Sequence, residues 1–236
     1  MSILKIYECL LSLKEDLMFV STEIGNEYHA YGLIGNTALP YALNLIPVHY
    51  RSFNRPMHRE HFETLNNQGI YITPATFIGN IAYKMERFNC MPDRYDLSWK
   101  DDPSKKGGRK DNYPDEGWWK MIARGSKAVF YLIAESDVIL PQYIRVGKFM
   151  SKCIVDIEAV SYSQKEDLFS TNIILRAEDI HPTIELLQYE KIPIQNGMYL
   201  RNVQFKGKGY EIQSQFFKNV NIPYQSAFYI ALGGKN

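Results

Sequence analysis

The chain opens with the sequence ILKIYECLLSL, residues 3–13. Alternate side chains of an extended strand point to opposite faces. Cys9 and Leu11 would lie on one face of this segment. Ile6 and Leu10 would lie on the other face. A strand that is apolar on both faces is typical of the interior of a sheet that is covered on both sides. The sequence therefore predicts an inner strand here.

A helix is predicted to follow this strand after a turn at Gly35. Asn36 or Thr37 can cap its first turn, where Pro40 is also tolerated. Its apolar side chains recur at helical spacing and would pack on the preceding strand; they are Ala38, Leu39, Ala42, Leu43 and Ile46. A strand that leads into such a helix begins a ferredoxin-like fold.

Apolar patterns predict further elements along the chain. The run over residues 128–134 is apolar without interruption, which indicates a central strand. Residues 153–160 alternate between apolar and polar side chains, which indicates a half-buried strand. The remaining predictions are a helix over residues 58–68 and strands over residues 70–73 and 198–205.

The composition favours a folded chain without strong overall charge. The 236 residues are 45% hydrophobic, enough for a full core, and the formal net charge is +1. A net charge this small gives no overall basic character that would indicate a nucleic-acid partner. Any contact with RNA would therefore have to come from local patches of positive charge. Cys9, Cys90 and Cys153 lack metal-ligand spacing and are expected to be buried free thiols. No apolar run predicts a membrane span or secretory signal, so we expect a cytoplasmic protein with no membrane partner.

Two parts of the chain carry a family pattern. The first joins LMFVSTEIG, residues 17–25, to NTALPYAL, residues 36–43. The second is LPQYIRVGKFMSK, residues 140–152. Together they resemble the type I-D CRISPR Cascade subunit that caps the 5′ handle of the guide RNA (crRNA), a member of the RAMP superfamily. Neither part is a catalytic signature.

The resemblance implies an α+β fold, namely a single ferredoxin-like (RRM-like) RAMP domain over residues 1–236. A long thumb-like insertion would span residues 83–127, and a β-rich C-terminal extension would span residues 172–236. The implied function is a non-catalytic effector subunit that binds the crRNA 5′ handle. Its implied partners are the repeated backbone subunit and the large subunit, and it could share in recognising the PAM of the target DNA.

The connector before the strand at 153–160 contains a candidate phosphate site. Arg145, Lys148 and Lys152 supply cations there. Gly147 and Ser151 add a backbone N–H and a hydroxyl. Such groups together can cradle an RNA phosphate. In the alternative interpretation, the glycine only permits a turn and the lysines are solvated.

The expected insertion begins with Lys84, Arg87 and Asn89, which the resemblance places near the base of the thumb. The two cations could hold phosphate, and the asparagine could meet a base edge. In the alternative interpretation, the segment is a long surface loop whose charges serve solubility. Further along it, Trp118 and Trp119 are adjacent, so an extended chain would turn one ring inward and one outward. The outward ring could stack on a base or dock a partner.

Two helix-associated groups have structural and functional interpretations. Asn36 could present its polar atoms to a phosphate, although its role as a helix cap is a sufficient explanation. His58 and His61 lie three residues apart on the predicted second helix, but no partnered ligand set accompanies them. We therefore expect structural histidines, and we assign neither a metal nor a cofactor.

A second function remains open on the sequence alone. Some handle-binding subunits cleave precursor crRNA without a metal, which requires a base, an acid and a stabilising cation. His29, Tyr31 and Lys84 are candidates for such a metal-independent endoribonuclease. The sequence contains no phosphate-binding loop, dinucleotide fingerprint, nucleophile elbow or paired metal motif, which disfavours a small-molecule enzyme.

Overall fold

The computed structural model describes residues 4–24, 26–46, 58–90, 115–194 and 197–228. In this part of the chain β-strands dominate and form three sheets. Its α-helices are α1 (Leu39–Ala42) and α2 (His58–Asn67). The fold is therefore mostly β, with less helix than the predicted α+β class implies. No helix in the described residues is long and apolar enough to cross a membrane.

The first sheet has seven strands in the order β10-β11-β1-β9-β6-β4, and β5 pairs with β9 beside β6. The inner position of β1 is confirmed, because β9 and β11 flank it in antiparallel register. The central position of β9 is confirmed as well. The strands are β1 (Lys5–Leu13), β4 (Leu33–Ile34), β5 (Ile70–Ile72), β6 (Ala75–Phe77), β9 (Lys127–Ala134), β10 (Tyr143–Val146) and β11 (Ser151–Ala159).

The first predicted helix is much shorter than its apolar pattern suggests. Helix α1 covers only Leu39–Ala42, and the chain enters the left-handed region at Asn44, with φ of 61°. A left-handed residue breaks the α-helical hydrogen-bond pattern. The apolar stripe is nevertheless buried, since Leu43 and Ile46 belong to the core. Helix α2 lies close to its predicted bounds, and Gly69 follows it with φ of 65°.

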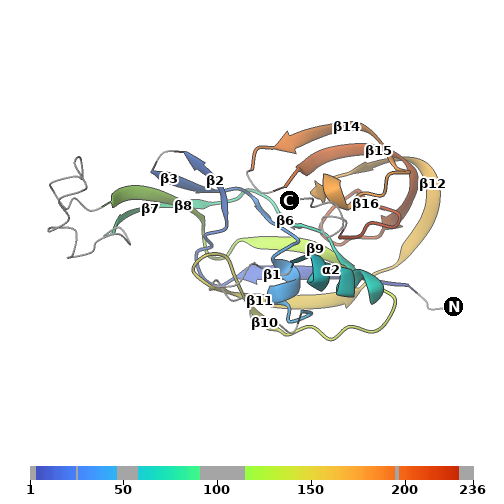
Figure 1. Ribbon diagram of the computed structural model, residues 1–236, viewed down its shortest axis with the longest axis horizontal. Helices are drawn as coiled ribbons and strands as arrows, with labels where there is room; N and C mark the ends of the chain where they lie inside the picture. The colour runs from blue at the N-terminus through green and yellow to red at the C-terminus, as the bar shows by residue number, and fades with distance from the viewer. Residues whose placement is uncertain (1–3, 25, 47–57, 91–114, 195–196, 229–236) are drawn as a thin grey trace, which may run out of the picture.

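The second sheet stacks over the first (Figure 1). Its central strand is β15, and β12, β13, β14 and β16 all pair with it. The β-rich extension was expected to begin at residue 172. The second sheet begins ten residues earlier, because β12 pairs with β15 along its whole length. The strands are β12 (Tyr162–Thr171), β13 (Leu175–Arg176), β14 (Glu185–Ile192), β15 (Tyr199–Ile212) and β16 (Val220–Pro223).

A buried polar cluster joins the two sheets. The Tyr131 hydroxyl on β9 donates to Glu8 Oε1 on β1 over 2.8 Å. The Ser214 hydroxyl donates to the same oxygen over 2.5 Å, and the Gln215 N–H donates to Glu8 Oε2 over 3.2 Å. Residues 214 and 215 lie two and three residues after the end of β15. The Glu8 carboxylate therefore fixes the segment that leaves the second sheet onto the first.

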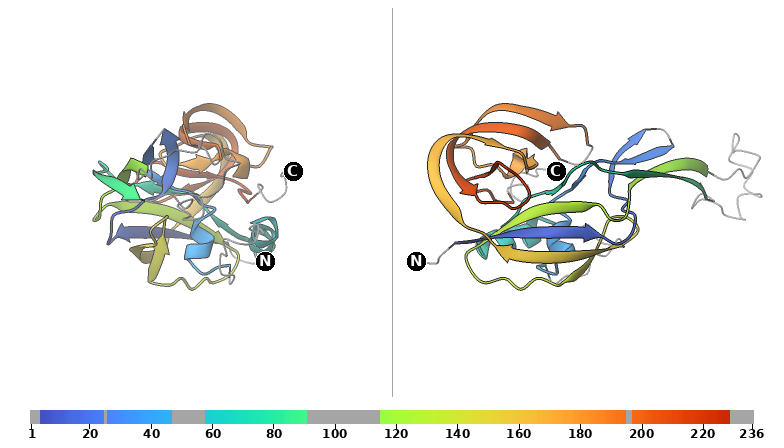
Figure 2. Two further views of the ribbon diagram at one scale, coloured as in Figure 1. Left: turned by 60° about the vertical axis from the view of Figure 1, so that its left-hand side comes forward. Right: turned by 180° about the vertical axis from the view of Figure 1, so that it is seen from behind.

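The third sheet projects from the stacked pair (Figures 1 and 2). Its order is β2-β3-β8-β7, in which β7 (Tyr83–Cys90) and β8 (Asp115–Ile122) form an antiparallel pair. These two strands and residues 123–127 are the described part of the expected insertion; residues 91–114 lie outside the described residues. The sequence did not predict that β2 (Val20–Ile24) and β3 (Glu27–Ala30) would join them.

Candidate nucleic-acid interface

The segment between β1 and β2 receives the connector that precedes β11. The Lys148 N–H donates to the Met18 carbonyl over 2.7 Å. The Ser151 hydroxyl donates to the Asp16 carbonyl over 2.7 Å. The Lys152 N–H donates to the Glu15 carboxylate over 2.9 Å. The connector is therefore held by hydrogen bonds to residues 15–18, which we call the hub.

The same hub holds the base of the β7–β8 pair. Leu17 and Ile122 exchange backbone hydrogen bonds of 2.8 and 3.0 Å. The Lys84 ammonium lies 3.0 Å from Asp16 Oδ2, and the Arg124 N–H donates to Asp16 Oδ1 over 2.8 Å. The Arg124 N–H and the Lys84 ammonium lower the pKa of Asp16 from its usual value, so this carboxylate stays charged at neutral pH. The connector and the base of the β7–β8 pair, which are separate in the sequence, thus meet at the hub.

Gly147 permits the close approach of the connector to the hub. Its φ is +78°, and a Cβ atom at this position would lie 2.6 Å from the Met18 carbonyl oxygen. Other residues rarely adopt such a φ, and a side chain would push against the backbone. The structure therefore shows that Gly147 permits a turn at this position.

Gly147→Ala is expected to lower the free energy of unfolding by about 2 kcal/mol, because it combines backbone strain with a backbone clash. Gly125→Ala is the matched control, since Gly125 has φ of +85° and no atom within 4 Å of the position that the new methyl group would occupy. Urea denaturation of the two variants separates the clash from the strain. Equal losses in both would show that the contact with Met18 contributes nothing.

An aromatic layer supports the connector from the third sheet. Trp119 on β8 stacks on Phe88 with ring centroids 4.7 Å apart, and it packs against Phe149 of the connector at 4.4 Å. The Lys148 ammonium lies 5.3 Å from the centroid of the Tyr28 ring. Trp118 points to the other face and is 43% exposed. The predicted division into one inward and one outward ring is confirmed.

Exposed cations lie on the segments that meet at the hub. Arg145 and Lys152 are cross-strand partners on β10 and β11, so their side chains share a face. Arg145 also donates to the Met150 carbonyl over 2.9 Å. Within the described part of the chain, Lys148 and Lys152 form no ion pair. The candidate residues predicted from the sequence did not include two exposed cations of this region, Lys14 and Arg124. Lys14 directly precedes the hub in the chain, whereas Arg124 reaches it only through the fold, where its N–H donates to Asp16 Oδ1.

Several predicted site residues do not contribute to this surface. Asn36 is fully buried and caps no helix, because α1 begins after Ala38; its amide donates to Ile72 and Asp179 instead. Ser151 is buried against the hub, with its hydroxyl occupied. Neither side chain is accessible to an RNA phosphate.

The other thumb residues do not lie beside Lys84, whose ammonium is itself ion-paired with Asp16 at 3.0 Å and with Glu86 at 3.5 Å. Arg87 forms an exposed ion pair with Glu116. The strand register puts Arg87 on the face that Trp118 shares, whereas Lys84 lies on the opposite face with Trp119. The side chain of Asn89 lies outside the described residues.

The three candidates for an endoribonuclease are not brought together. His29 is the register partner of Lys120, and its Nε2 lies 2.9 Å from Glu27 Oε2. Lys84 projects from the opposite face of this sheet, where it pairs with Asp16. Tyr31 follows β3 and lies outside the strand pairing. A base and a cation on opposite faces of one sheet cannot act on the same phosphate.

The histidines and cysteines take structural positions where they are described. His61 Nδ1 lies 2.9 Å from the Tyr41 hydroxyl, and the two rings meet edge to face. The side chain of His58 lies outside the described residues, as does that of Cys90. Cys9 and Cys153 are buried free thiols, as predicted. Burial raises the pKa of the Cys153 thiol to about 12, so it stays protonated.

Comparison with known proteins gives a family match along almost the whole chain. The model of the family described as "Type I-D CRISPR-associated protein Cas5/Csc1" matches residues 4–230. No curated protein sequence matches the chain.

Two solved structures are similar to the chain. One is a cryo-EM structure of the Type III-B Cmr-beta bound to cognate target RNA and AMPPnP, with 11% identity, a TM-score of 0.48, and coverage of 84% of this chain and 86% of that chain. The other is a crystal structure of a CRISPR protein from Archaeoglobus fulgidus, with 13% identity, a TM-score of 0.44, and coverage of 94% of this chain and 100% of that chain.

Proposed function

The chain belongs to the type I-D CRISPR-associated Cas5/Csc1 family, and from this premise we propose that it is a non-catalytic effector subunit that binds the 5′ handle of the crRNA. The RNA backbone contacts the cations around the hub, namely Lys84, Arg145, Lys148 and Lys152. The observation that carries the proposal is that the hub joins the connector, which contains Arg145, Lys148 and Lys152, to the base of the β7–β8 pair, which contains Lys84.

The charge arrangement supports an anionic ligand at this surface. Arg145 and Lys152 face each other across β10 and β11. Like charges directly opposite each other in a sheet are unfavourable. A phosphate between them would relieve this repulsion, and their shared exposure leaves room for one. Lys148 is held beside them by the hydrogen bond from its N–H to Met18.

The strand order supports a ferredoxin-like core for this subunit. In chain order, β1, β5 with β6, β9 and β11 are four successive positions. Across the sheet they stand in the order β11, β1, β9, and then β5 with β6. Helix α2 lies in the chain between β1 and β5. In a ferredoxin-like fold a second helix would lie in the chain between β9 and β11. Here residues 135–142 and the edge strand β10 take that place. The projecting β7–β8 pair then takes the place of a thumb.

The partners follow from the same proposal. The subunit contacts the repeated backbone subunit and the large subunit of the effector, and the exposed ring of Trp118 offers a stacking or docking surface on the far face of the third sheet. The placement of His29 and Lys84 on opposite faces of that sheet favours the non-catalytic role over the endoribonuclease.

The combined variant Arg145→Ala, Lys148→Ala and Lys152→Ala tests the RNA surface. We expect affinity for crRNA to fall by about one to two orders of magnitude at physiological salt. The slope of log affinity against log salt should fall by about 2, because each lost contact to a single-stranded phosphate removes about 0.7. Fluorescence anisotropy with labelled handle RNA over a salt series measures both quantities.

The matched control replaces Lys191, Lys206 and Lys208, which are three exposed lysines of the second sheet, with alanine. This variant loses the same charge, so it should keep most of the affinity and the salt slope. Equal losses in both variants would mean that only the net charge matters, and the hub would then not be the RNA site.

A further inference from the structure

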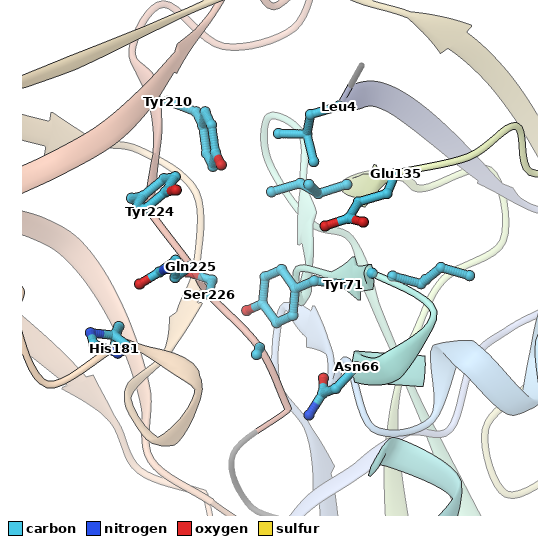
Figure 3. A pocket seen from close by; sticks show the side chains of 13 residues that line it. Leu4, Asn66, Tyr71, Glu135, His181, Tyr210, Tyr224, Gln225 and Ser226 are labelled. Carbon is cyan, nitrogen blue, oxygen red and sulfur yellow. The ribbon is translucent and has the colours of Figure 1, made fainter. Parts of the chain in front are cut away.

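A cleft of about 400 Å³ opens between the two stacked sheets. Figure 3 shows it. One wall is formed by Leu4 and by residues at the ends of α2, β5 and β9, and the other by Tyr210 and residues 224–227. Its volume lies in the range of about 300–1,000 Å³ that is usual for small-ligand sites. No residue of the hub lines it.

Tyrosine rings form much of the lining. Tyr210 and Tyr224 lie with ring centroids 5.6 Å apart and their planes tilted by 55°. Tyr71 lies on the opposite side, and its hydroxyl is directed to the buried carboxylate of Asp179 at 3.4 Å. Figure 3 shows the hydroxyls of Tyr210 and Tyr224 pointing across the cleft toward Glu135. The cleft therefore presents the hydroxyls of Tyr210 and Tyr224 opposite a carboxylate.

The Glu135 carboxylate is placed at the cleft and is not neutralised. Glu135 follows β9 and is exposed, and within the described residues it makes no hydrogen bond or ion pair. Its side chain lies over Gly69, where a Cβ atom would come within 2.6 Å of Glu135 Cγ. Burial, the neighbouring Tyr224 and Tyr162, and the charge of Glu135 together raise the pKa of Tyr210 above its usual value.

The charge of the lining selects the kind of ligand. Among the described residues that line the cleft, Glu135 is the only acid and no lysine or arginine is present. His181 is the other titratable group besides the tyrosines, and its Nδ1 lies 2.8 Å from the Thr183 hydroxyl. Such a lining attracts a cation and repels a phosphate.

We propose that this cleft receives an arginine side chain from a partner protein subunit. The planar guanidinium group forms a bidentate pair with the Glu135 carboxylate, and its remaining N–H groups donate to the hydroxyls of Tyr210 and Tyr224. The aliphatic part of the arginine lies along Leu4 and Ile133 at the cleft wall. The inference rests on the proposed function only in taking the partner to be another effector subunit. A guanine base also offers two parallel donors to a carboxylate, but its phosphates would meet no cation in the lining.

The test uses N-acetyl-L-arginine methylamide, titrated into the full ¹⁵N-labelled chain and followed by NMR. We expect saturable shifts of the Gly69, Glu135 and Ala227 amides, with weaker binding of the matching lysine compound. Glu135→Gln, which keeps the shape and removes the charge, should weaken binding about tenfold or more. Glu185→Gln, a change at an exposed acid of β14, should leave it unchanged.

The absence of shifts, equal binding by Glu135→Gln, or tighter binding of guanosine than of the arginine compound would overturn the proposal. The titration contains neither RNA nor another subunit, so its result is independent of whether the hub binds crRNA. If it succeeds, Glu135→Gln should also reduce co-purification of the partner subunits at least severalfold while leaving the affinity of the isolated chain for handle RNA unchanged. An unchanged yield of partners would overturn the assignment of the arginine to a subunit.

Discussion

Replacement of Glu8 by alanine is expected to lower the free energy of unfolding by about 3 kcal/mol or more. The Glu8 carboxylate accepts hydrogen bonds from the Tyr131 and Ser214 hydroxyls and from the Gln215 N–H, and Glu8 is only 3% exposed. Each buried donor that loses its acceptor costs about 1–3 kcal/mol. The Tyr131 and Ser214 hydroxyls lie 2.9 Å apart and can still bond each other, which partly offsets the loss.

Glu158→Ala is the control for this variant. Glu158 is the register partner of Glu8 on β11 and accepts a hydrogen bond of 2.7 Å from the Gln215 side chain, but it is exposed. Water can replace it, so the loss should stay below about 1 kcal/mol. Urea denaturation at neutral pH with equal m-values measures both changes. A similarly small loss for Glu8→Ala would show that the cluster does not hold the two sheets together.

The second large effect concerns the buried acid Asp179, which follows β13. Its Oδ2 accepts a hydrogen bond of 2.5 Å from the Asn36 amide, whereas its Oδ1 has no partner within the described residues. Burial raises the pKa of this carboxyl to about 7, even though Arg176, Asn36 and Tyr71 act in the opposite direction. At a pH between the ordinary pKa and this raised pKa, the folded protein therefore keeps a proton on Asp179 that the unfolded chain has already released.

Asp179→Asn should consequently remove a dependence of stability on pH. The folded state binds more protons than the unfolded state between the ordinary pKa of 3.8 and about 7. The contribution of this group is thus fully present below the lower value and is lost as pH rises through the upper one, by up to about 4 kcal/mol. Asparagine resembles the protonated acid, so the variant should exceed the natural chain in stability at pH 8 and approach it at pH 4.

Denaturant unfolding of both chains over pH 4–8 measures this difference. Asp137→Asn is the control, because Asp137 is exposed and its pKa is lowered by the hydrogen bond and charge of Lys5. That variant should leave the slope of the free energy of unfolding against pH almost unchanged over this range. Parallel curves for Asp179→Asn and the natural chain would show that Asp179 is ionised at neutral pH despite its burial.

The elements that the sequence predicted well are those whose side chains repeat with one period. The apolar run of β9 and the two apolar faces of β1 correctly indicated strands at the centre of a sheet. Helix α2 was predicted within a residue of its end for the same reason. Helix α1 was overextended, because a periodic stripe can be buried without being helical once a residue such as Asn44 turns the chain.

Burial of polar side chains was the main source of error at the candidate site. Asn36 and Ser151 are residue types that also cap helices and bind phosphate, and local sequence does not reveal whether they face water. Asn36 contacts Ile72 and Asp179, which are distant in the chain, so its role depends on the packing of three separate segments. Arg87 differs from them, because it is exposed and forms an ion pair with Glu116 on the neighbouring strand.

The sequence by itself determined the family pattern, the inner strands of the first sheet and the cations of the connector, because these depend on residue type and short-range period. Only the tertiary structure decided that the hub joins the connector to the β7–β8 pair and that Glu135 faces Tyr210 and Tyr224 across a cleft. Both arrangements bring together residues far apart in the chain. Their geometry is set by strand register and by close backbone contacts such as that at Gly147, which no local pattern encodes.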